Sequence, residues 1–149
     1  MHREAGVLII HSPVNLGGES AATIFGQKYH TLGELYMPGT MGIEISDEVT
    51  PLPVDVVLPE RNSADAFIRT GLQDILKEKG ITNLIISGFN ATLSVNETVD
   101  EASESHDLTC YTLKDGIGVD NSRSMPANIL FSLQLSSTVI TCDQAKAML

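Results

Sequence analysis

The sequence predicts an α/β protein with a doubly wound, mostly parallel sheet of the Rossmann-like three-layer type. Short runs rich in Val, Ile and Leu alternate with segments of helical periodicity, which is typical of βαβ units with right-handed crossovers. The runs are continuously apolar, and such strands belong to sheets covered on both faces. At 149 residues the chain has the length of one domain, so we expect a single domain over residues 1–149.

Five apolar runs are predicted to form the strands. They are short, rich in β-branched residues and bounded by polar or turn residues. The predicted strands are Val7–Ile10, Val54–Leu58, Asn83–Ser87, Leu108–Leu113 and Thr138–Thr141. The segment Ser12–Val49 has no clear period, and a segment of that length is usually a binding loop, a lid or an interface segment.

The first predicted helix covers Ala64–Lys79. Its apolar side chains recur at the 3, 4 and 7 spacing of one helix face, which indicates an amphipathic helix. Ser63 is placed to cap its N-terminus, and Gly80 is placed to end it, because glycine readily adopts the left-handed conformation found there.

Three more helices are predicted in the second half of the chain. The helix over Leu93–Ser105 has acidic residues on its outer side and three apolar residues on its inner side: Val95, Val99 and Ala102. The next helix begins near Ser124, because Pro126 suits a first helical turn. A short helix over Asp143–Leu149 follows the last strand.

The charge balance limits the partners. Nineteen Asp plus Glu against nine Lys plus Arg give a net charge of -10, which repels a phosphate backbone, so we expect no nucleic-acid partner. No apolar run approaches the roughly 20 residues that cross a bilayer, and the N-terminus has no signal-peptide core. We therefore expect a soluble, cytoplasmic protein with no membrane partner.

The two cysteines, Cys110 and Cys142, lie in apolar contexts without CxxC spacing or a neighbouring cluster of histidines. A free cysteine of this kind usually behaves as a small buried hydrophobe. Nothing in the sequence calls for a metal or an organic cofactor, and we expect neither.

A longer motif spans Leu84–Thr98, where an apolar run leads into Gly88 and then into Ser94-Val95 and Thr98. This segment resembles the signature of the isochorismatase-like cysteine hydrolases, in which a strand runs into Gly-Val-x-x-x-x-Cys-Val-x-x-Thr. The flanking segments agree in order and spacing. Ala66–Leu72 is similar to the family's Ser-Ala-Phe-x-x-Thr-x-Leu, and Lys114-Asp115-Gly116 follows a strand where the family has Asp-Ala.

The resemblance implies a catalytic triad of Asp, Lys and Cys, and all three positions differ here. Ser94 stands at the cysteine position, and Glu60 or Arg61 stands at the lysine position, depending on a one-residue alignment choice. Neither replaces a lysine ammonium faithfully. Val7–Ile10 aligns with the family's second strand, so the first strand and its Asp are absent. In the alternative alignment, Val7–Ile10 corresponds to the family's first strand, and His11 then stands where the family has its Asp.

The family's first strand is central in its sheet, between the second and the fourth strands. Its loss leaves two strand edges without a partner, and exposed edges recruit other chains. Three explanations stay open: the sheet closes around the gap, another chain supplies the missing strand, or the chain is shorter than an ancestral one. Because the family usually forms dimers or larger assemblies, we expect this protein to be a homo-oligomer.

These observations favour a divergent family member with a broken triad, acting by small-molecule binding or as an oligomeric scaffold and not as a cysteine hydrolase. The alternative is a small-molecule enzyme with a rearranged site: a hydrolase of an amide or ester, an isochorismatase-like hydrolase, or an enzyme of a non-hydrolytic reaction such as a lyase or cyclisation step. Ser94 would be its nucleophile, His11 its base and Glu60 the group that orients the base. The family's cis peptide after the glycine, which helps to build an oxyanion hole, falls at Phe89–Asn90.

Ligands of doubly wound sheets bind at the carboxyl ends of the strands. The candidate ligand-binding residues near these ends are Asn15, Phe67, Phe89 and Asn90. Ordinary structural roles stay open for the catalytic candidates: Ser94 as a helix N-cap, His11 as a hydrogen-bonded loop residue, and Glu60 with Arg61 as a surface ion pair. A third interpretation is a purely structural protein whose contact surface is Ser12–Val49.

Overall fold

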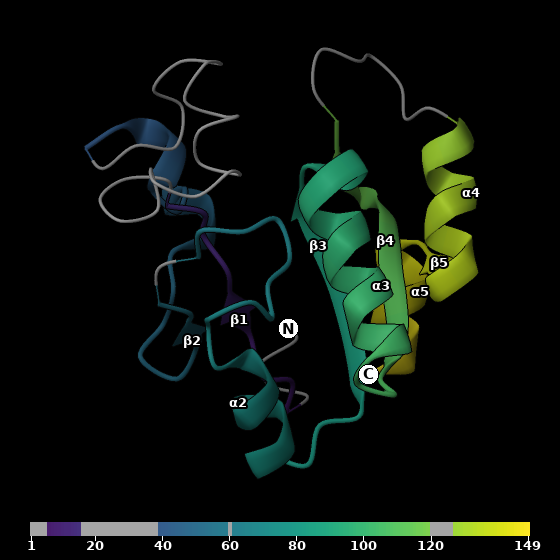
Figure 1. Cartoon of the computed structure of the whole chain (residues 1–149), viewed down its shortest axis with the longest axis horizontal. Helices are drawn as coiled ribbons and strands as arrows, with labels where there is room; N and C mark the ends of the chain where they lie inside the picture. Colours follow the sequence, from purple (N-terminus) through teal and green to yellow (C-terminus); the bar gives the residue numbers. More distant parts are fainter. Residues whose placement is uncertain (1–5, 16–38, 60, 120–126) are drawn as a thin grey trace. The chain divides into compact units, whose positions relative to one another are not determined.

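The computed structural model describes residues 6–15, 39–59, 61–119 and 127–149 (Figure 1). The chain divides into two compact units, Met1–Gly71 and Leu72–Leu149, and each is described by itself. Every described strand pair is parallel, which confirms the predicted α/β class. The described strands form two sheets, one in each unit. A single domain over residues 1–149 stays a prediction.

The first unit holds a two-stranded parallel sheet made of β1 (Ile10–His11) and β2 (Val56–Val57). Strand β2 lies within the predicted Val54–Leu58, whereas β1 shares only Ile10 with the predicted Val7–Ile10 and ends one residue later. The pairing resumes further along the chain in an isolated bridge between Val14 and Arg61. Two short 3-10 helices, η3 (Met41–Ile43) and η4 (Asp47–Val49), precede β2 within the segment that showed no period.

Among the described residues of the first unit, polar and apolar residues are buried in equal number. Leu58, Ala64 and Ala66 are its buried apolar residues among those described, and three polar residues are buried with them: Arg61, Asp65 and Thr70. Hydrogen bonds hold the turns after β2, since the Phe67 amide donates to the Asp65 carboxylate at 2.8 Å and the Thr70 hydroxyl donates to the Ala66 carbonyl at 2.6 Å.

The helix predicted over Ala64–Lys79 is wrong in its first half. Helix α2 covers only Leu72–Glu78, so Ser63 is not its cap. Arg69 and Gly71 have φ angles of 61° and 75°, in the left-handed region that interrupts a right-handed helix. The other end is as predicted: Gly80, with φ 64°, ends the helix, and its amide donates to the Lys77 carbonyl at 3.1 Å.

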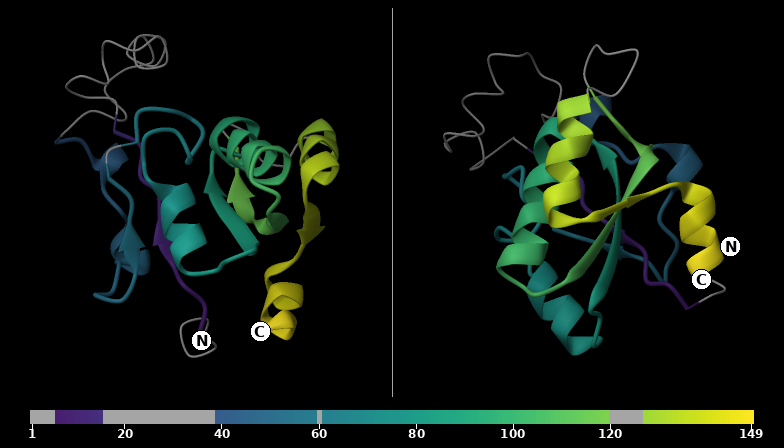
Figure 2. Two further views of the ribbon diagram at one scale, coloured as in Figure 1. Left: turned by 60° about the horizontal axis from the view of Figure 1, so that its bottom comes forward. Right: turned by 90° about the vertical axis from the view of Figure 1, so that its right-hand side faces the viewer.

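The second unit contains a parallel sheet of β3 (Asn83–Phe89), β4 (Thr109–Gly118) and β5 (Thr138–Ile140), in that order. Its main helices are α3 (Asn96–Glu104), α4 (Ala127–Ser136) and α5 (Cys142–Met148). Helices α3 and α4 cover one face of this sheet and α5 lies on the other (Figures 1 and 2). The predicted start of α4 at Ser124 lies outside the described residues.

The core of the second unit is apolar. Leu133 of α4, Val99 of α3 and Thr112 of β4 are its largest fully buried side chains. The Thr112 hydroxyl is satisfied by the Ser137 hydroxyl at 2.9 Å, which donates in turn to the Leu133 carbonyl at 2.7 Å. Val95 and Ala102 are also buried, so the predicted inner face of the helix after β3 is confirmed.

Strand β4 runs past its predicted end because it contains a bulge. Ile86 pairs with Thr112, but Gly88 pairs with Ile117, so extra residues of β4 lie opposite a short step of β3. Beyond the bulge, β4 pairs with β3 again up to Phe89 and Gly118. The bulge contains Lys114-Asp115-Gly116 and brings the end of β4 alongside the end of β3.

Candidate functional site

In the second unit, the candidate site lies where β3 ends. A cis peptide joins Phe89 to Asn90, at the bond where the family resemblance places it. A π-helical turn, η5 (Ala91–Val95), then leads into α3. The Asn90 carboxamide oxygen accepts from the Thr92 amide at 2.9 Å and from the Thr92 hydroxyl at 2.8 Å, so Asn90 caps the turn.

Ser94 lies inside this turn and is half-buried. Its predicted role as N-cap is wrong, because the cap is Asn90, four residues earlier. The Val95 amide donates to the Asn90 carbonyl at 3.1 Å, which is the i to i−5 bond of a π-helical turn. Among the described residues of its unit, no histidine or carboxylate is hydrogen-bonded to the Ser94 hydroxyl.

The ring of Phe89 lies against the backbone of β4. Gly118 pairs with Phe89, and a Cβ atom at Gly118 would lie 3.3 Å from Phe89 Cδ2, tighter than most such contacts. Phe89 is nevertheless 51% exposed, so part of it is open to solvent beside the capped turn. The sequence analysis missed Gly118, although a glycine opposite an aromatic residue indicates a close approach of this kind.

Asp115, in the bulge of β4, contacts the first turn of α5. Its carboxylate accepts from the Cys142 amide at 2.8 Å in the first turn of α5, and this bond lowers the pKa of the Asp115 carboxyl. Residue Asp115 therefore holds the chain after β5 against the bulge. The position that resembles the family's Asp-Ala thus has a structural contact within the second unit.

The surroundings of both cysteines disfavour the thiolate. Cys110 is buried within β4, where desolvation raises the pKa of its thiol to about 11. Cys142 is half-buried, and the hydrogen bond of its side chain to Asp115 raises the pKa of its thiol. A reactive cysteine needs the opposite shift, toward the thiolate. The prediction of buried thiols is confirmed for Cys110 and only partly met by Cys142.

In the first unit, His11 at the end of β1 faces Asp55, just before β2. His11 Nε2 lies 3.6 Å from Asp55 Oδ2, and the two side chains are 14% and 1% exposed. The same carboxylate oxygen accepts from the Leu52 amide at 2.8 Å, which fixes the turn before β2. The sequence analysis gave Glu60 as the partner of His11. Glu60 lies outside the described residues, and Asp55 was missed.

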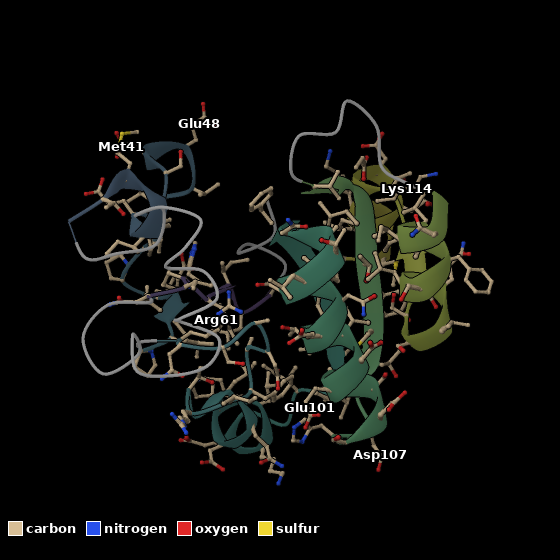
Figure 3. The ribbon with its side chains drawn as sticks, turned by 45° about the horizontal axis from the view of Figure 1, so that its top comes forward. Met41, Glu48, Arg61, Glu101, Asp107 and Lys114 are labelled. Atoms are coloured by element: carbon tan, nitrogen blue, oxygen red, sulfur yellow. The ribbon has the colours of Figure 1, made fainter. Side chains whose placement is uncertain are left out.

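Arg61 is buried, so its predicted place at the surface is wrong, and Glu60, its predicted partner, lies outside the described residues. Its guanidinium donates through Nη1 to the Ala64 carbonyl, and its own carbonyl accepts from the Asn15 amide at 2.9 Å. Figure 3 shows the Arg61 side chain among those of the first unit. Arg61 pairs with Val14, whereas His11 pairs with Val57, so His11 and Arg61 lie about three residues, or roughly 10 Å, apart along the strands.

The structure therefore brings together Phe89, Asn90 and Ser94 in the second unit. Asn15 and Arg61 are joined in the first unit, where Phe67 is held by Asp65. The convergence of the two sets on one mouth stays a prediction. Among the described residues, no three His, Cys, Asp or Glu side chains are grouped as ligands for a metal ion, and no helix is long and apolar enough to span a membrane.

Parallel strands, with helices on both faces of the larger sheet and a capped turn after β3, define an α/β protein of the three-layer class. The model of the isochorismatase domain matches residues 2–144, so the chain belongs to the isochorismatase family. The family resemblance seen in the sequence is thereby confirmed.

Solved structures agree on the fold. N-carbamoylsarcosine amidase from Thermoplasma acidophilum superposes with a TM-score of 0.79 at 22% identity, over 95% of this chain and 76% of that one. A cysteine hydrolase from Pseudomonas syringae pv. phaseolicola 1448A gives a TM-score of 0.79 at 16% identity, over 96% and 72%. The isochorismatase family protein YddQ of Bacillus subtilis (strain 168) is 28% identical over 99 residues, or 64% of this chain. The match spans about half (54%) of the length of YddQ.

Proposed function

We propose that this chain uses the isochorismatase fold to bind a small molecule without cysteine-hydrolase chemistry. The observation that carries the proposal is that both thiols lie away from the turn after β3, in surroundings that disfavour the thiolate. The sequence contains two cysteines, and the pKa of each is raised, so neither thiol supplies a thiolate near neutral pH. Neither lies in the turn after β3, which contains Ser94, the residue that the family resemblance aligns with the nucleophile.

Serine cannot simply take over from cysteine in this turn. A thiol ionises near pH 8.5 and needs only a modest shift to become a nucleophile, whereas a hydroxyl needs a positioned base. At the lysine position, Arg61 is one of the two candidates, and its guanidinium is buried against the Ala64 carbonyl. These contacts support a site that has kept its turn and cap but lost the groups of the triad.

The test combines binding and turnover with one set of compounds. N-carbamoylsarcosine and a panel of small amides and esters are titrated into the protein by calorimetry and incubated with it while ammonia or acid release is followed. We expect binding without turnover, and loss of binding in Ser94→Phe, which fills the turn. Turnover that disappears in Cys142→Ser or Cys110→Ser would establish a cysteine hydrolase and contradict the proposal. If no compound of the panel binds, the proposed small-molecule binding is contradicted as well.

A second candidate function is hydrolysis by a rearranged site, and the contact between His11 and Asp55 favours it. The buried Asp55 carboxylate lies 3.6 Å from His11 Nε2, and a small approach that closes a hydrogen bond would let it orient the imidazole as a general base. In this hydrolase, Ser94 is the nucleophile, His11 is the general base, and Asp55 takes the orienting role that the sequence analysis predicted for Glu60. We expect Ser94→Ala, His11→Ala and Asp55→Asn to lower such turnover together, with Glu48→Gln as an exposed control. Activity that survives Ser94→Ala excludes it.

We also propose that the family's first strand has no counterpart in this chain. Two features support this: the described strands form two separate sheets, and β3, at the edge of its sheet, is exposed along much of its length. Amide hydrogen exchange tests it, because an edge strand leaves every second amide unpaired. In dilute protein we expect alternate amides of β3 to exchange fast while those of β4 are protected. Uniform protection of β3 contradicts the proposal.

A further inference from the structure

Two asparagines bracket the turn that contains Ser94. Asn90 caps the start of η5, and the backbone amide of Asn96, the residue that follows η5, donates to the Leu93 carbonyl. The turn between them has the wide π-helical geometry, which is rare and occurs mostly as single turns, frequently at functional sites. A backbone form that is rare on its own is selected by contacts from the surrounding structure, so the contacts of the two asparagines help to hold the turn.

The side chain of Asn96 forms two hydrogen bonds. Its carboxamide nitrogen donates to Asp100 Oδ2, one turn further along α3, at 2.8 Å, and its carboxamide oxygen accepts from the Ser132 hydroxyl of α4 at 2.8 Å. An ionised carboxylate can only accept, so the nitrogen must face Asp100 and the oxygen must face Ser132. Both ends of the carboxamide are therefore used, and the junction of η5 and α3 is joined to a helix 36 residues away in sequence.

Asparagine is an unfavourable residue at this point of the chain unless its side chain has partners. Asn96 lies inside a continuous helical segment, Ala91–Glu104. In a helix the asparagine side chain competes for backbone groups, so asparagine is less favourable there than alanine. Here the side chain is half-buried, and both of its polar atoms bond to other side chains. We therefore attribute the asparagine at this position to its side-chain contacts and not to helix propensity.

Helix α4 gives this contact a fixed point. Ser132 is next to Leu133, which is fully buried in the core of the unit and whose carbonyl accepts from the Ser137 hydroxyl at 2.7 Å. Helices α3 and α4 cover the same face of the sheet (Figures 1 and 2). The position of Asn96 is thus set by a helix packed against the core as well as by the backbone of its own turn.

We propose that Asn96 is a positioning residue for the candidate site: through its bond to Ser132 it holds the end of the turn against α4 and so sets the direction of the Ser94 side chain. Only Val95, which is buried, stands between Ser94 and Asn96, so a displacement of Asn96 is passed on to Ser94. The inference rests on the proposed function in one respect, that Ser94 belongs to the ligand site. It makes that site sensitive to the position of α4.

An engineered thiol at position 94 tests the positioning role without any ligand. In Ser94→Cys, alkylation by iodoacetamide is measured as a function of pH. After cleavage at glutamate, mass spectrometry follows the peptide between Glu78 and Glu97, which contains neither native cysteine. A thiol in this turn is close to the N-terminal end of α3, where the helix dipole favours the thiolate, so the pH midpoint of alkylation reports where residue 94 lies.

We expect Ser132→Ala and Asn96→Ala, each added to Ser94→Cys, to raise this midpoint by about half a pH unit or more. Ser132→Thr keeps the hydroxyl and should keep the midpoint. Ser103→Ala is the matched control, because the Ser103 hydroxyl donates to the backbone carbonyl of Asp100 and not to Asn96. An unchanged midpoint in Ser132→Ala or Asn96→Ala overturns the proposal, even where the melting temperature falls. So does an equal rise in Ser132→Thr or Ser103→Ala.

This outcome is separate from that of the binding test, because alkylation needs no ligand. If no compound of the panel binds, the proposed function fails, and the midpoint still decides whether Asn96 positions residue 94. If a compound binds, its dissociation constant should rise several-fold in Ser132→Ala and stay unchanged in Ser103→Ala. A dissociation constant that does not respond to Ser132→Ala contradicts the proposed sensitivity of the ligand site to α4.

Discussion

The two units of the chain are stabilised differently. In the second, β3 and β4 extend over seven and ten residues and pack against α3 and α4 with an apolar core around Val99 and Leu133. In the first, β1 and β2 pair over two residues each, and among the described residues buried polar groups are as numerous as buried apolar ones. The comparison teaches that hydrophobic periodicity defines the second unit, whereas specific polar contacts define the first.

This contrast predicts where substitutions cost most. Leu133→Ala removes the most deeply buried side chain of α4 and leaves a cavity, so we expect a loss of about 2–5 kcal/mol in the free energy of unfolding. Leu135→Ala, two residues further along the same helix at an exposed site, is the matched control and should change the value little in dilute protein. Urea denaturation measures both. Equal effects would mean that α4 is not packed as described.

In the first unit, the largest effect should come from a carboxylate. Asp55→Ala removes the acceptor of the Leu52 amide and the negative group beside His11, and we expect a loss of about 1–3 kcal/mol in the free energy of unfolding. Glu48→Ala, at an exposed carboxylate of η4, should have a much smaller effect. If Asp55→Ala is as mild as its control in urea denaturation, buried polar contacts do not define this unit.

A single buried hydroxyl sharpens the comparison inside the apolar core. Thr112→Val keeps the shape of the side chain but removes its bond to Ser137, so we expect a loss of about 0.5–1.5 kcal/mol in thermal unfolding. Thr109→Val, at an exposed position of the same strand, is the control. A stabilising Thr112→Val would indicate that the hydroxyl pair contributes nothing and that the second unit depends on apolar packing alone.

The smallest expected effect is a pH dependence at Asp115. Its pKa is lowered in the folded protein by the bond from the Cys142 amide, so its contribution is complete above the ordinary carboxyl pKa and is lost as the pH falls through the lowered value. The difference in melting temperature between the parent and Asp115→Asn should therefore shrink on acidification. Asp107→Asn is the control, and a difference that grows with acidification contradicts the assignment.

The sequence by itself determined the α/β class, the approximate positions of five strands, the inner face of the helix after β3 and the family. These features follow from hydrophobic periodicity and motif spacing, which are local properties of the sequence and do not depend on which distant residues meet. It also placed the cis peptide at Phe89–Asn90 and Ser94 in the turn after β3.

Only the tertiary structure decided the polar details of the candidate site. The predicted helix over Ala64–Lys79 starts at Leu72, because the left-handed residues Arg69 and Gly71 interrupt a pattern that looked continuous. Asn90 caps the turn instead of Ser94, and Asp55 faces His11 across two strands. Periodicity reports which residues avoid water, but it does not tell which buried polar atoms meet, since that depends on residues far apart in sequence.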